Sequence, residues 1–224
     1  MEFSLVSGSN EEMLFGCIES LTKTMKGSPY AWGLTVTCNG SGTGLGGRLR
    51  ARYPHVTVLE NDAPRSAAAN HNRVLRLSRS RHLWLVSDNV VLMPETVRRV
   101  TEFLDAPQNS RVGVLGPRLL NPDGTLQPSA YEFPSMRKMI VAHSGLERVP
   151  VARSALARLA PRRRPAISSM IEEPGKTIEV DTLRGVCIAV RMKAARQVGP
   201  MNESPGAGGE EADWHRRFHE DGLG

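Results

Sequence analysis

The stretch from residue 82 to residue 104, HLWLVSDNVVLMPETVRRVTEFL, decides the fold class of this 224-residue chain. It opens with His82–Val86, whose apolar run predicts a strand that is buried on both faces. Three small polar residues, 87–89, end that strand. Pro94 is then tolerated in a first helical turn, so we expect it to open a helix that runs to Leu104. A buried strand that leads through a polar loop into a helix is the repeating unit of a parallel α/β sheet.

The same unit recurs three times upstream, and a fifth predicted strand follows downstream. Residues 11–24 carry apolar side chains at three- and four-residue spacing, which predicts an amphipathic helix capped by Ser9 or Asn10. The order of elements predicts a Rossmann-like, mainly parallel sheet flanked by helices, with ligands bound beyond the carboxyl ends of its strands. The predicted strands are 2–6, 32–38, 55–59, 82–86 and 111–115, the other helices are 48–53 and 67–78, and the ligand-binding loops are 7–10, 38–47, 60–66 and 87–93.

The second half of the chain has a different character. Residues 117–128 contain the turn signals Asn-Pro and Asp-Gly, and residues 136–176 are rich in Arg, Ala and Pro, which favours helical pieces and loop. Residues 186–191 predict a further strand, and residues 210–220 predict a polar helix with acidic residues at its start. We therefore expect a single domain over 1–224, with halves at 1–116 and 117–224 and a smaller β region in the second half.

The chain is basic, with a formal net charge of +6, and Arg supplies most of that charge: five of its 29 basic residues are Lys and the remaining 24 are Arg. Guanidinium groups suit diphosphate recognition, although genomic base composition explains the same excess. The run Arg162–Arg164 predicts either a solvated loop or contact of segment 137–165 with an anionic membrane surface. No helix-turn-helix, zinc-finger or ribonucleoprotein motif accompanies the charge, so we expect no nucleic-acid partner.

The three cysteines, Cys17, Cys38 and Cys187, are odd in number and far apart. This pattern argues against a disulfide scaffold and against a zinc site. The sequence shows no signal-peptide pattern and no apolar run approaching 18 residues. We therefore expect a cytoplasmic protein, with peripheral contact at the inner face of the membrane as a further candidate.

A glycine-rich loop offers the first candidate chemistry. Gly42, Gly44 and Gly47 satisfy the G-x-G-x-x-G spacing after a predicted strand, and Glu60 follows Gly42 by 18 residues. In a dinucleotide or S-adenosylmethionine enzyme, such a loop holds phosphate or the cofactor and the acid binds a ribose hydroxyl. The alternative is a Gly/Ser loop without a ligand, because GSGTGLGG matches several registers and follows the second predicted strand rather than the first.

The polar residues after the fourth predicted strand offer the second candidate chemistry. Asp88 and Asn89 carry the oxygen ligands that Mg²⁺ or Mn²⁺ prefers, and a divalent cation there would neutralise a leaving diphosphate. The alternative is an Asx turn or helix cap before Pro94.

Three carboxylates open the last predicted helix, at Glu210, Glu211 and Asp213. The helix dipole favours acids in a first turn, which is one sufficient explanation of them. A carboxylate there also suits a general base for an acceptor hydroxyl.

Taken together, these segments resemble the family-2 glycosyltransferases, in particular the bacterial rhamnosyltransferase-like members, from Val6 to about Gly222. The most specific segment is VGVLGPRLLNPDGTLQPSAYEFPS at 112–135. The others are VSGSNEEMLFGCIESL at 6–21, TCNGSGTG at 37–44, VLENDAPRSAAANHN at 58–72, the metal-motif strand and helix at 83–107, VDTLRGVCIAVRMKAARQVGPMNE at 180–203 and GGEEADWHRRFHEDG at 208–222.

The resemblance implies a GT-A fold, a nucleoside diphosphate sugar donor and inverting transfer to a glycan, lipid-linked or small-molecule acceptor in bacterial glycan or glycosylated-metabolite synthesis. Residues 1–116 would bind the nucleotide sugar and residues 117–224 the acceptor. Glu211 would be the catalytic base, supported by Glu210 and Asp213. The implied nucleotide-sugar contacts are Ser7, Ser9, Cys38, Asn39, Asp88, Arg184 and Gly185, and the implied metal ligands are Asp88 and Asn89.

The sequence departs from the family's pattern on the donor side. Cys38 stands where the family has an acid that contacts the nucleobase, Gly8 stands where an aromatic is common, and Asn89 replaces an acid of the metal motif. These departures keep a second hypothesis open, namely a degenerate, non-catalytic sugar-nucleotide binder or partner subunit. A homodimer is a further expectation.

Overall fold

The computed structural model describes residues 1–8, 10–40, 44–133, 175–204 and 209–223. The chain divides into two compact units, the first formed by Met1–Pro117 together with Leu183–Gly224 and the second by Arg118–Thr182. The segment Leu183–Gly224, which we expected in the second half, thus belongs to the same unit as the first 117 residues. The basic segment 137–165, with Arg162–Arg164, lies outside the described residues.

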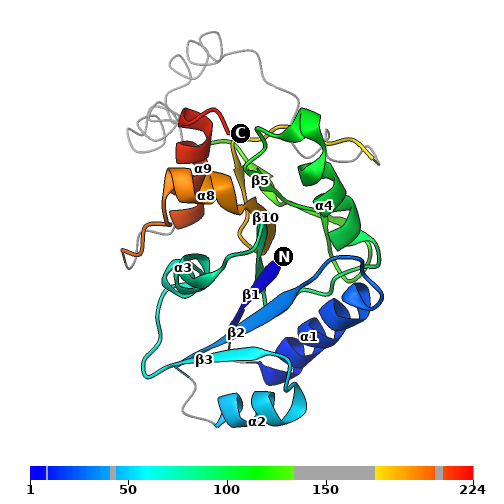
Figure 1. Ribbon diagram of the computed structural model, residues 1–224, viewed down its shortest axis with the longest axis vertical. Coiled ribbons are helices and arrows are strands. Elements are labelled where there is room, and N and C mark those ends of the chain that lie inside the picture. Colours follow the sequence, from blue (N-terminus) through cyan, green and yellow to red (C-terminus); the bar gives the residue numbers. More distant parts are fainter. Residues whose placement is uncertain (9, 41–43, 134–174, 205–208, 224) are drawn as a thin grey trace, which may run out of the picture. The chain divides into compact units, whose positions relative to one another are not determined.

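A six-stranded sheet forms the centre of the first unit, in the order β3-β2-β1-β4-β10-β5 (Figure 1). The strands β1 to β4 are parallel, whereas β10 is antiparallel to both of its neighbours. The mixed α/β class with a mainly parallel sheet is therefore confirmed. The strands are β1 (Glu2–Ser7), β2 (Gly33–Asn39), β3 (Thr57–Asn61), β4 (His82–Ser87), β5 (Val114–Leu115) and β10 (Cys187–Arg191).

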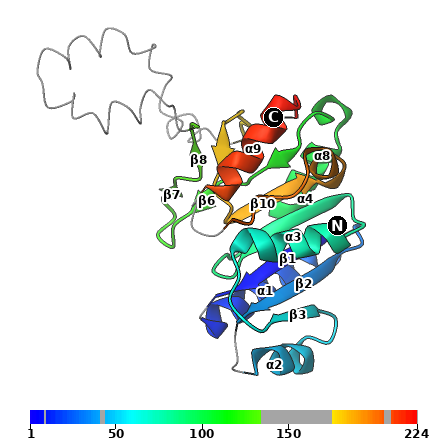
Figure 2. The same cartoon turned by 90° about the vertical axis from the view of Figure 1, so that its left-hand side faces the viewer.

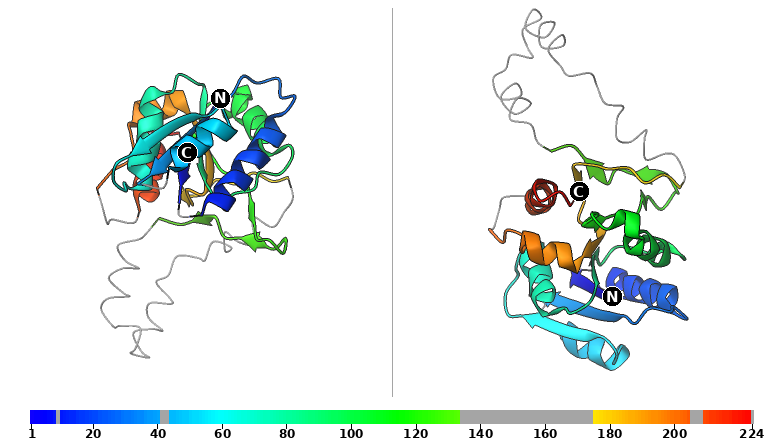
Figure 3. Two further views of the ribbon diagram at one scale, coloured as in Figure 1. Left: turned by 90° about the horizontal axis from the view of Figure 1, so that it is seen from below. Right: turned by 45° about the horizontal axis from the view of Figure 1, so that its top comes forward.

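Helices cover both faces of this sheet (Figures 1 and 3). On one face lie α3, α8 and α9, which share an apolar cluster with β4 and β10. On the other lie α1 and α4, while α2 packs along the edge strand β3 (Figure 2). Their bounds are α1 (Glu11–Met25), α2 (Leu45–Arg52), α3 (Ala67–Leu77), α4 (Thr96–Asp105), the 3₁₀ turn Pro107–Asn109, α8 (Met192–Val198) and α9 (Glu210–Glu220).

The strand β4 is the buried centre that the sequence predicts. Leu83 and Leu85 belong to the apolar cluster under α3, α8 and α9, and the alternate residues Trp84 and Val86 are equally buried. Trp84 stacks on Phe3 of β1 with ring centroids 5.7 Å apart. Each large apolar side chain buried in this way stabilises the fold by about 1.5–3 kcal/mol, so the sheet is anchored along β4 and β1.

Two predicted helix starts have different outcomes. Asn10 caps α1 as expected, because its side-chain oxygen accepts hydrogen bonds from the N–H groups of Glu12 and Met13 at 3.0 and 3.2 Å. The predicted helix start at Pro94 is wrong, since α4 begins at Thr96. The reason is local: Glu95 has a φ of 69°, a left-handed conformation that a right-handed helix does not accept.

The second unit contains a short hairpin at its start. The strands β6 (Leu119–Leu120) and β7 (Leu126–Gln127) pair antiparallel. Asp123 shapes the turn between them by accepting a hydrogen bond from the Thr125 N–H at 2.9 Å, which agrees with the predicted turn signals. Two further short strands are β8 (Ala130–Tyr131) and β9 (Thr182–Leu183), and the boundary between the two units falls within β9.

Within the described ranges, no helix combines the length and the apolar character that crossing a membrane requires.

Candidate active site

One edge of the six-stranded sheet collects most of the predicted site residues. The four parallel strands end there, at Ser7, Asn39, Asn61 and Ser87. Because β10 runs in the opposite direction, its amino end lies at the same edge, and the Ser87 N–H donates a hydrogen bond to the Val186 carbonyl at 2.8 Å. The loop after β4 and the turn at 184–186, which are about a hundred residues apart in sequence, therefore lie side by side.

Asp88 is held at this edge by the loop that follows β1. One of its carboxylate oxygens, Oδ2, accepts a hydrogen bond from the backbone N–H of Gly8. A Cβ atom on Gly8 would lie 2.9 Å from that oxygen, so a larger residue there would displace the Asp88 carboxylate. Within the described residues, the second oxygen, Oδ1, accepts no hydrogen bond. Asp88 thus keeps one oxygen for a ligand.

The residues after β4 fit a divalent cation only in part. Asp88 supplies a single carboxylate, and Asn89 is exposed and supplies a neutral amide. In the part of the chain that the structure describes, no three His, Cys, Asp or Glu side chains gather as a metal cluster. Mg²⁺ in proteins is often held by one or two carboxylates together with substrate phosphates. With Asp88 as its one carboxylate, this donor set would hold a cation only together with oxygens from a bound ligand.

Asn39 ties the end of β2 to the loop before α3. Its side-chain oxygen accepts hydrogen bonds from the Arg65 N–H at 2.8 Å and from the Asn61 amide at 3.1 Å, and its own amide donates to the Arg65 carbonyl at 3.0 Å. The Asn61 amide also donates to Asn70 on α3 at 2.6 Å. This amide network fixes the shape of the loop 60–66, and it occupies the Asn39 side chain.

The side chains of Ser7 and Cys38 lie below the surface of the site. They are opposite each other in the β1–β2 register, and they are 4% and 1% exposed. The Ser7 hydroxyl accepts a hydrogen bond from the Asn39 N–H at 3.1 Å. At this depth, both residues would meet a ligand through their backbone rather than their side chains. Ser9 lies outside the described residues.

The carboxylate of Glu211 rests against Gly185. A Cβ atom on Gly185 would lie 2.3 Å from the Glu211 Oε1 atom and 2.9 Å from its Cδ atom. No side chain other than hydrogen fits in that space, so glycine is required for this arrangement. The contact brings the first turn of α9 onto the turn before β10, at the edge of the sheet where Asp88 lies.

Glu211 is half-buried, and its surroundings raise the pKa of its carboxyl group above the ordinary value. Burial is the main cause and the neighbouring charge of Glu210 adds to it, while a backbone hydrogen bond and the charge of Arg184 act in the opposite direction. A carboxylate with a raised pKa is a stronger base. Arg184 is exposed and close enough to influence this carboxylate.

The other two acids of the last helix make local contacts. Asp213 is exposed and forms an ion pair with Arg217 one turn further along the helix, at 3.3 Å. Glu210 accepts a hydrogen bond from the Gly209 N–H at 3.2 Å, at the start of the helix. Of the three predicted carboxylates, Glu211 is thus the one that contacts the turn before β10.

The helix α9 is fixed by contacts that the sequence pattern does not reveal. Trp214 is fully buried, and its indole N–H donates to the Gly199 carbonyl at 2.8 Å. Arg217 donates to the carbonyls of Val198 and Pro200 at 3.0 and 2.8 Å. These bonds join α9 to the connection that leaves α8.

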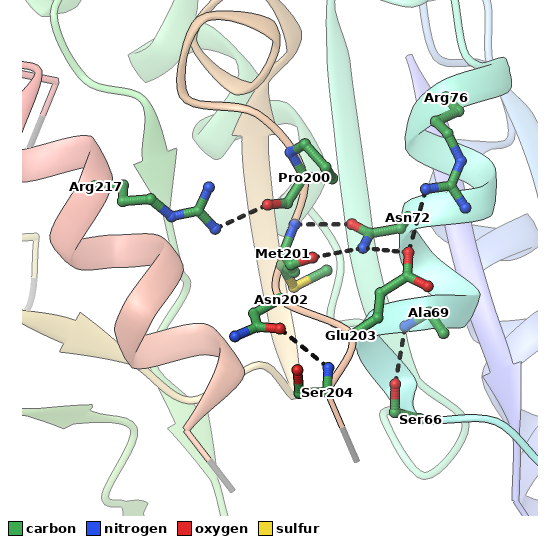
Figure 4. A network of polar contacts seen from close by, with 10 residues as sticks. All are labelled: Ser66, Ala69, Asn72, Arg76, Pro200, Met201, Asn202, Glu203, Ser204 and Arg217. Carbon is green, nitrogen blue, oxygen red and sulfur yellow. Dashed lines mark hydrogen bonds and ion pairs between the residues drawn. The ribbon is translucent and has the colours of Figure 1, made fainter. Parts of the chain in front are cut away.

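Asn72 of α3 holds the same connection from the other side (Figure 4). Its amide donates to the Met201 carbonyl at 2.8 Å, and its oxygen accepts from the Met201 N–H at 2.9 Å, as a paired strand would. The amide also donates to Glu203 at 2.8 Å, and Glu203 pairs with Arg76 at 3.2 Å. Asn72 is fully buried, so it acts as an internal clamp on the segment that leads to α9.

We expect replacement of Asn72 to lower the free energy of unfolding strongly. Asn72→Ala leaves both backbone groups of Met201 without their partner, and each buried unsatisfied group costs about 1–3 kcal/mol. We expect the urea midpoint to fall by the equivalent of at least about 2 kcal/mol. Arg76→Ala is the matched control, because it removes only an exposed ion pair and should cost less than about 1 kcal/mol. Equal losses in the two variants would contradict the clamp.

The described residues of the candidate dinucleotide site, those of the glycine-rich motif and Glu60, lie at the helix α2. Gly44 stands at the start of α2 with a φ of 72°, and Gly42 lies outside the described residues. The Glu60 carboxylate packs against Gly46 and pairs with Arg50 at 2.7 Å. The acid that a dinucleotide site would offer to ribose is therefore engaged with α2.

Comparisons with known proteins bear on the fold. Neither a scan against models of protein families nor a search of curated proteins finds a match. Among solved structures, the chain is similar to the mannosyltransferase PcManGT from Pyrobaculum calidifontis in complex with GDP-Man and Mn²⁺, with a TM-score of 0.62 and 13% identity over 99% of this chain and 52% of that one.

Two structures of S. aureus TarS 1–349 are also similar to it. For one of them the TM-score is 0.58 and the identity 13%, over 97% of this chain and 55% of that one. The other, in complex with UDP-GlcNAc, has a TM-score of 0.58 and 14% identity, over 97% of this chain and 53% of that one. The chain thus spans about half the length of these proteins. At this identity the likeness concerns the fold alone, and the fold is that of solved glycosyltransferase structures.

Proposed function

We propose that this chain is an inverting glycosyltransferase of the family-2, GT-A type, which moves a sugar from a nucleoside diphosphate sugar to an acceptor hydroxyl. The observation that carries the proposal is the packing of the Glu211 carboxylate onto Gly185, with a raised pKa, at the sheet edge that also holds Asp88. The fold supports it, because PcManGT and TarS were solved with nucleotide sugars.

The proposed reaction is a single displacement. The acceptor oxygen attacks the anomeric carbon, the bond from that carbon to the diphosphate oxygen breaks, and the proton of the acceptor hydroxyl passes to Glu211. Because attack and departure occur on opposite faces of the carbon, the configuration inverts. Glu210 supports the base through its charge, which raises the Glu211 pKa. In this proposal Asp213 contributes only by stabilising α9, through its pair with Arg217.

The donor would lie along the carboxyl edge of the parallel strands. Arg184 would meet the diphosphate; its exposure and its electrostatic effect on the Glu211 carboxylate support this role. Ser7, Cys38 and Asn39 would border the nucleoside through their backbone. A divalent cation held by Asp88, with Asn89 beside it, would supply charge neutralisation for the diphosphate. The Mn²⁺ in the PcManGT structure supports the use of a divalent cation.

A ligand screen tests the proposal. Nucleoside diphosphates and their sugars at about 100 times Kd should stabilise the protein by about 2.7 kcal/mol, a rise in Tm of roughly 5 °C or more. Each ligand is tested with and without Mn²⁺, and release of nucleoside diphosphate is measured in parallel. Stabilisation with release supports an enzyme. Stabilisation without release, with every acceptor and cation tried, favours the non-catalytic binder, and no stabilisation by any of these ligands overturns both.

A further inference from the structure

A cavity of about 620 Å³, wide open to solvent, lies at the opposite edge of the sheet from the candidate active site. It is formed by the end of α1, the connection to β2 and the residue after α2, all at the amino ends of parallel strands. Its volume is in the range of small-molecule sites, about 300–1,000 Å³. The lining residues used below are Glu19, Lys23, Lys26, Trp32 and Tyr53.

Aromatic rings form a fixed wall of this cavity. Trp32 is half-exposed, and its ring meets Phe3 and His55 edge to face, with centroids 6.2 and 6.1 Å away. Tyr53 is 8% exposed and also meets His55 edge to face, at 6.3 Å. Contacts of this kind hold the rings in place before any ligand arrives, so the cost of ordering them on binding is small.

The charges around the cavity leave a positive excess. The Glu19 carboxylate pairs with Arg52 at 2.5 Å and accepts a hydrogen bond from the Tyr53 hydroxyl at 3.2 Å, so its charge is already balanced. Lys23 and Lys26 are both exposed, and neither forms an ion pair with another described residue. Two ammonium groups therefore remain beside an aromatic wall, and an anionic ligand would compensate them.

We propose that this cavity binds a small ligand in which a ring with an apolar face carries an anionic group. The ring lies against the aromatic wall at Trp32, and the phosphate or carboxylate lies at Lys23 and Lys26. The site is separate from the candidate active site and does not depend on the proposed transferase function. Apolar rings with a few convergent polar groups are the usual composition of a small-molecule site. The ring is that of an aromatic compound or of a sugar, and the two are separated by the test.

The indole N–H signals of the ¹⁵N-labelled full chain provide the readout. The protein has three tryptophans, and both Trp84 and Trp214 are fully buried. Trp32 alone among them is half-exposed, so a ligand in the cavity should move its signal and leave the other two in place. The probes are phenyl phosphate and glucose 6-phosphate. Two fragments are tested beside them: phenol, which lacks the charge, and inorganic phosphate, which lacks the ring.

The proposal expects at least one of the two phosphorylated rings to shift the Trp32 signal with saturation, and to bind more tightly than either fragment. Lys23→Ala and Lys26→Ala should each weaken that binding by roughly three- to tenfold, as loss of a charge-assisted contact does. Lys193→Ala is the control, because it removes the same charge from α8. The proposal is overturned if neither phosphorylated ring gives a saturable shift. It is also overturned if inorganic phosphate binds as tightly as the phosphorylated rings, or if the Lys23, Lys26 and Lys193 variants all have the same affinity.

Discussion

Glu211→Gln is expected to lower kcat for sugar transfer by about 10²–10⁴-fold and to leave donor binding unchanged. The amide keeps the size of the side chain and its place over Gly185, but it accepts no proton from the acceptor hydroxyl. The measurement is steady-state transfer together with the donor Kd from a thermal-shift titration. Because the shape is conserved, a loss of rate without a loss of affinity isolates the proton transfer from the folding of the site.

The matched control is Glu220→Gln, at the other end of α9. It makes the same chemical change on the same helix at an exposed position. We expect full activity from it. Full activity in Glu211→Gln would remove the base assignment, whereas equal losses in both variants would indicate damage to the helix.

The pH profile gives an independent check on the same carboxylate. A base works only when it is deprotonated, so the raised pKa of Glu211 places the acid-side fall of kcat/KM at a higher pH than an ordinary Glu would. Glu210→Gln removes a neighbouring negative charge, so the pKa of Glu211 should fall and the acid limb should move to lower pH. An acid limb that stays in place in Glu210→Gln would mean that another group titrates there.

Gly185→Ala is expected to reduce transfer by about 10²-fold, the usual cost of a displacement of about 1 Å in a reacting group. The added methyl would lie 2.3 Å from the Glu211 Oε1 atom, so the carboxylate must move away from the edge of the sheet. Transfer rate and urea unfolding are measured on the same preparation. The expected result is a large loss of activity with a smaller loss of stability, because the conflict concerns the end of one side chain.

Gly16→Ala serves as the control for a glycine replacement. Gly16 is exposed within α1, and a Cβ atom there would meet nothing within 4 Å. Alanine in a helix interior is more stable than glycine by about 0.5–1 kcal/mol, so this variant should be slightly stabilised and fully active. Wild-type activity in Gly185→Ala would show that the position of the Glu211 carboxylate over Gly185 has no part in the reaction.

Much of the fold could be predicted because its signals are local. The apolar run at 82–86 forms β4, and the polar segment Glu210–Glu220 forms α9 with the predicted bounds. The start of α4 was missed because Pro94 marks a turn as readily as a first helical turn, and the left-handed Glu95 decides between them. The position of β10 between β4 and β5 could not be predicted either, since no local sequence pattern encodes which distant strands pair with β10.

In the candidate site, too, local features could be predicted from the sequence and long-range contacts could not. The loop residue Asp88 was predicted to lie at the carboxyl edge of the sheet, and it does, because parallel topology brings strand ends together. Glu211 and Gly185 are 26 positions apart in sequence, and their contact depends on where the Glu211 side chain points. Hydrophobic periodicity does not reveal that direction. The sequence predicts Asn72 only as part of the helix 67–78, and its pairing with Met201 is visible only in three dimensions.

The antiparallel strand β10 has a consequence for how the molecule reaches this state during synthesis. While the ribosome has delivered only the first hundred or so residues, β4 has β1 on one side and an open, strongly apolar edge on the other. That edge closes only after residues 187–191 emerge and pair with it, about a hundred positions later. Uncovered edges of this kind can recruit other chains, so we expect the nascent protein to be most prone to aggregation before residues 187–191 emerge.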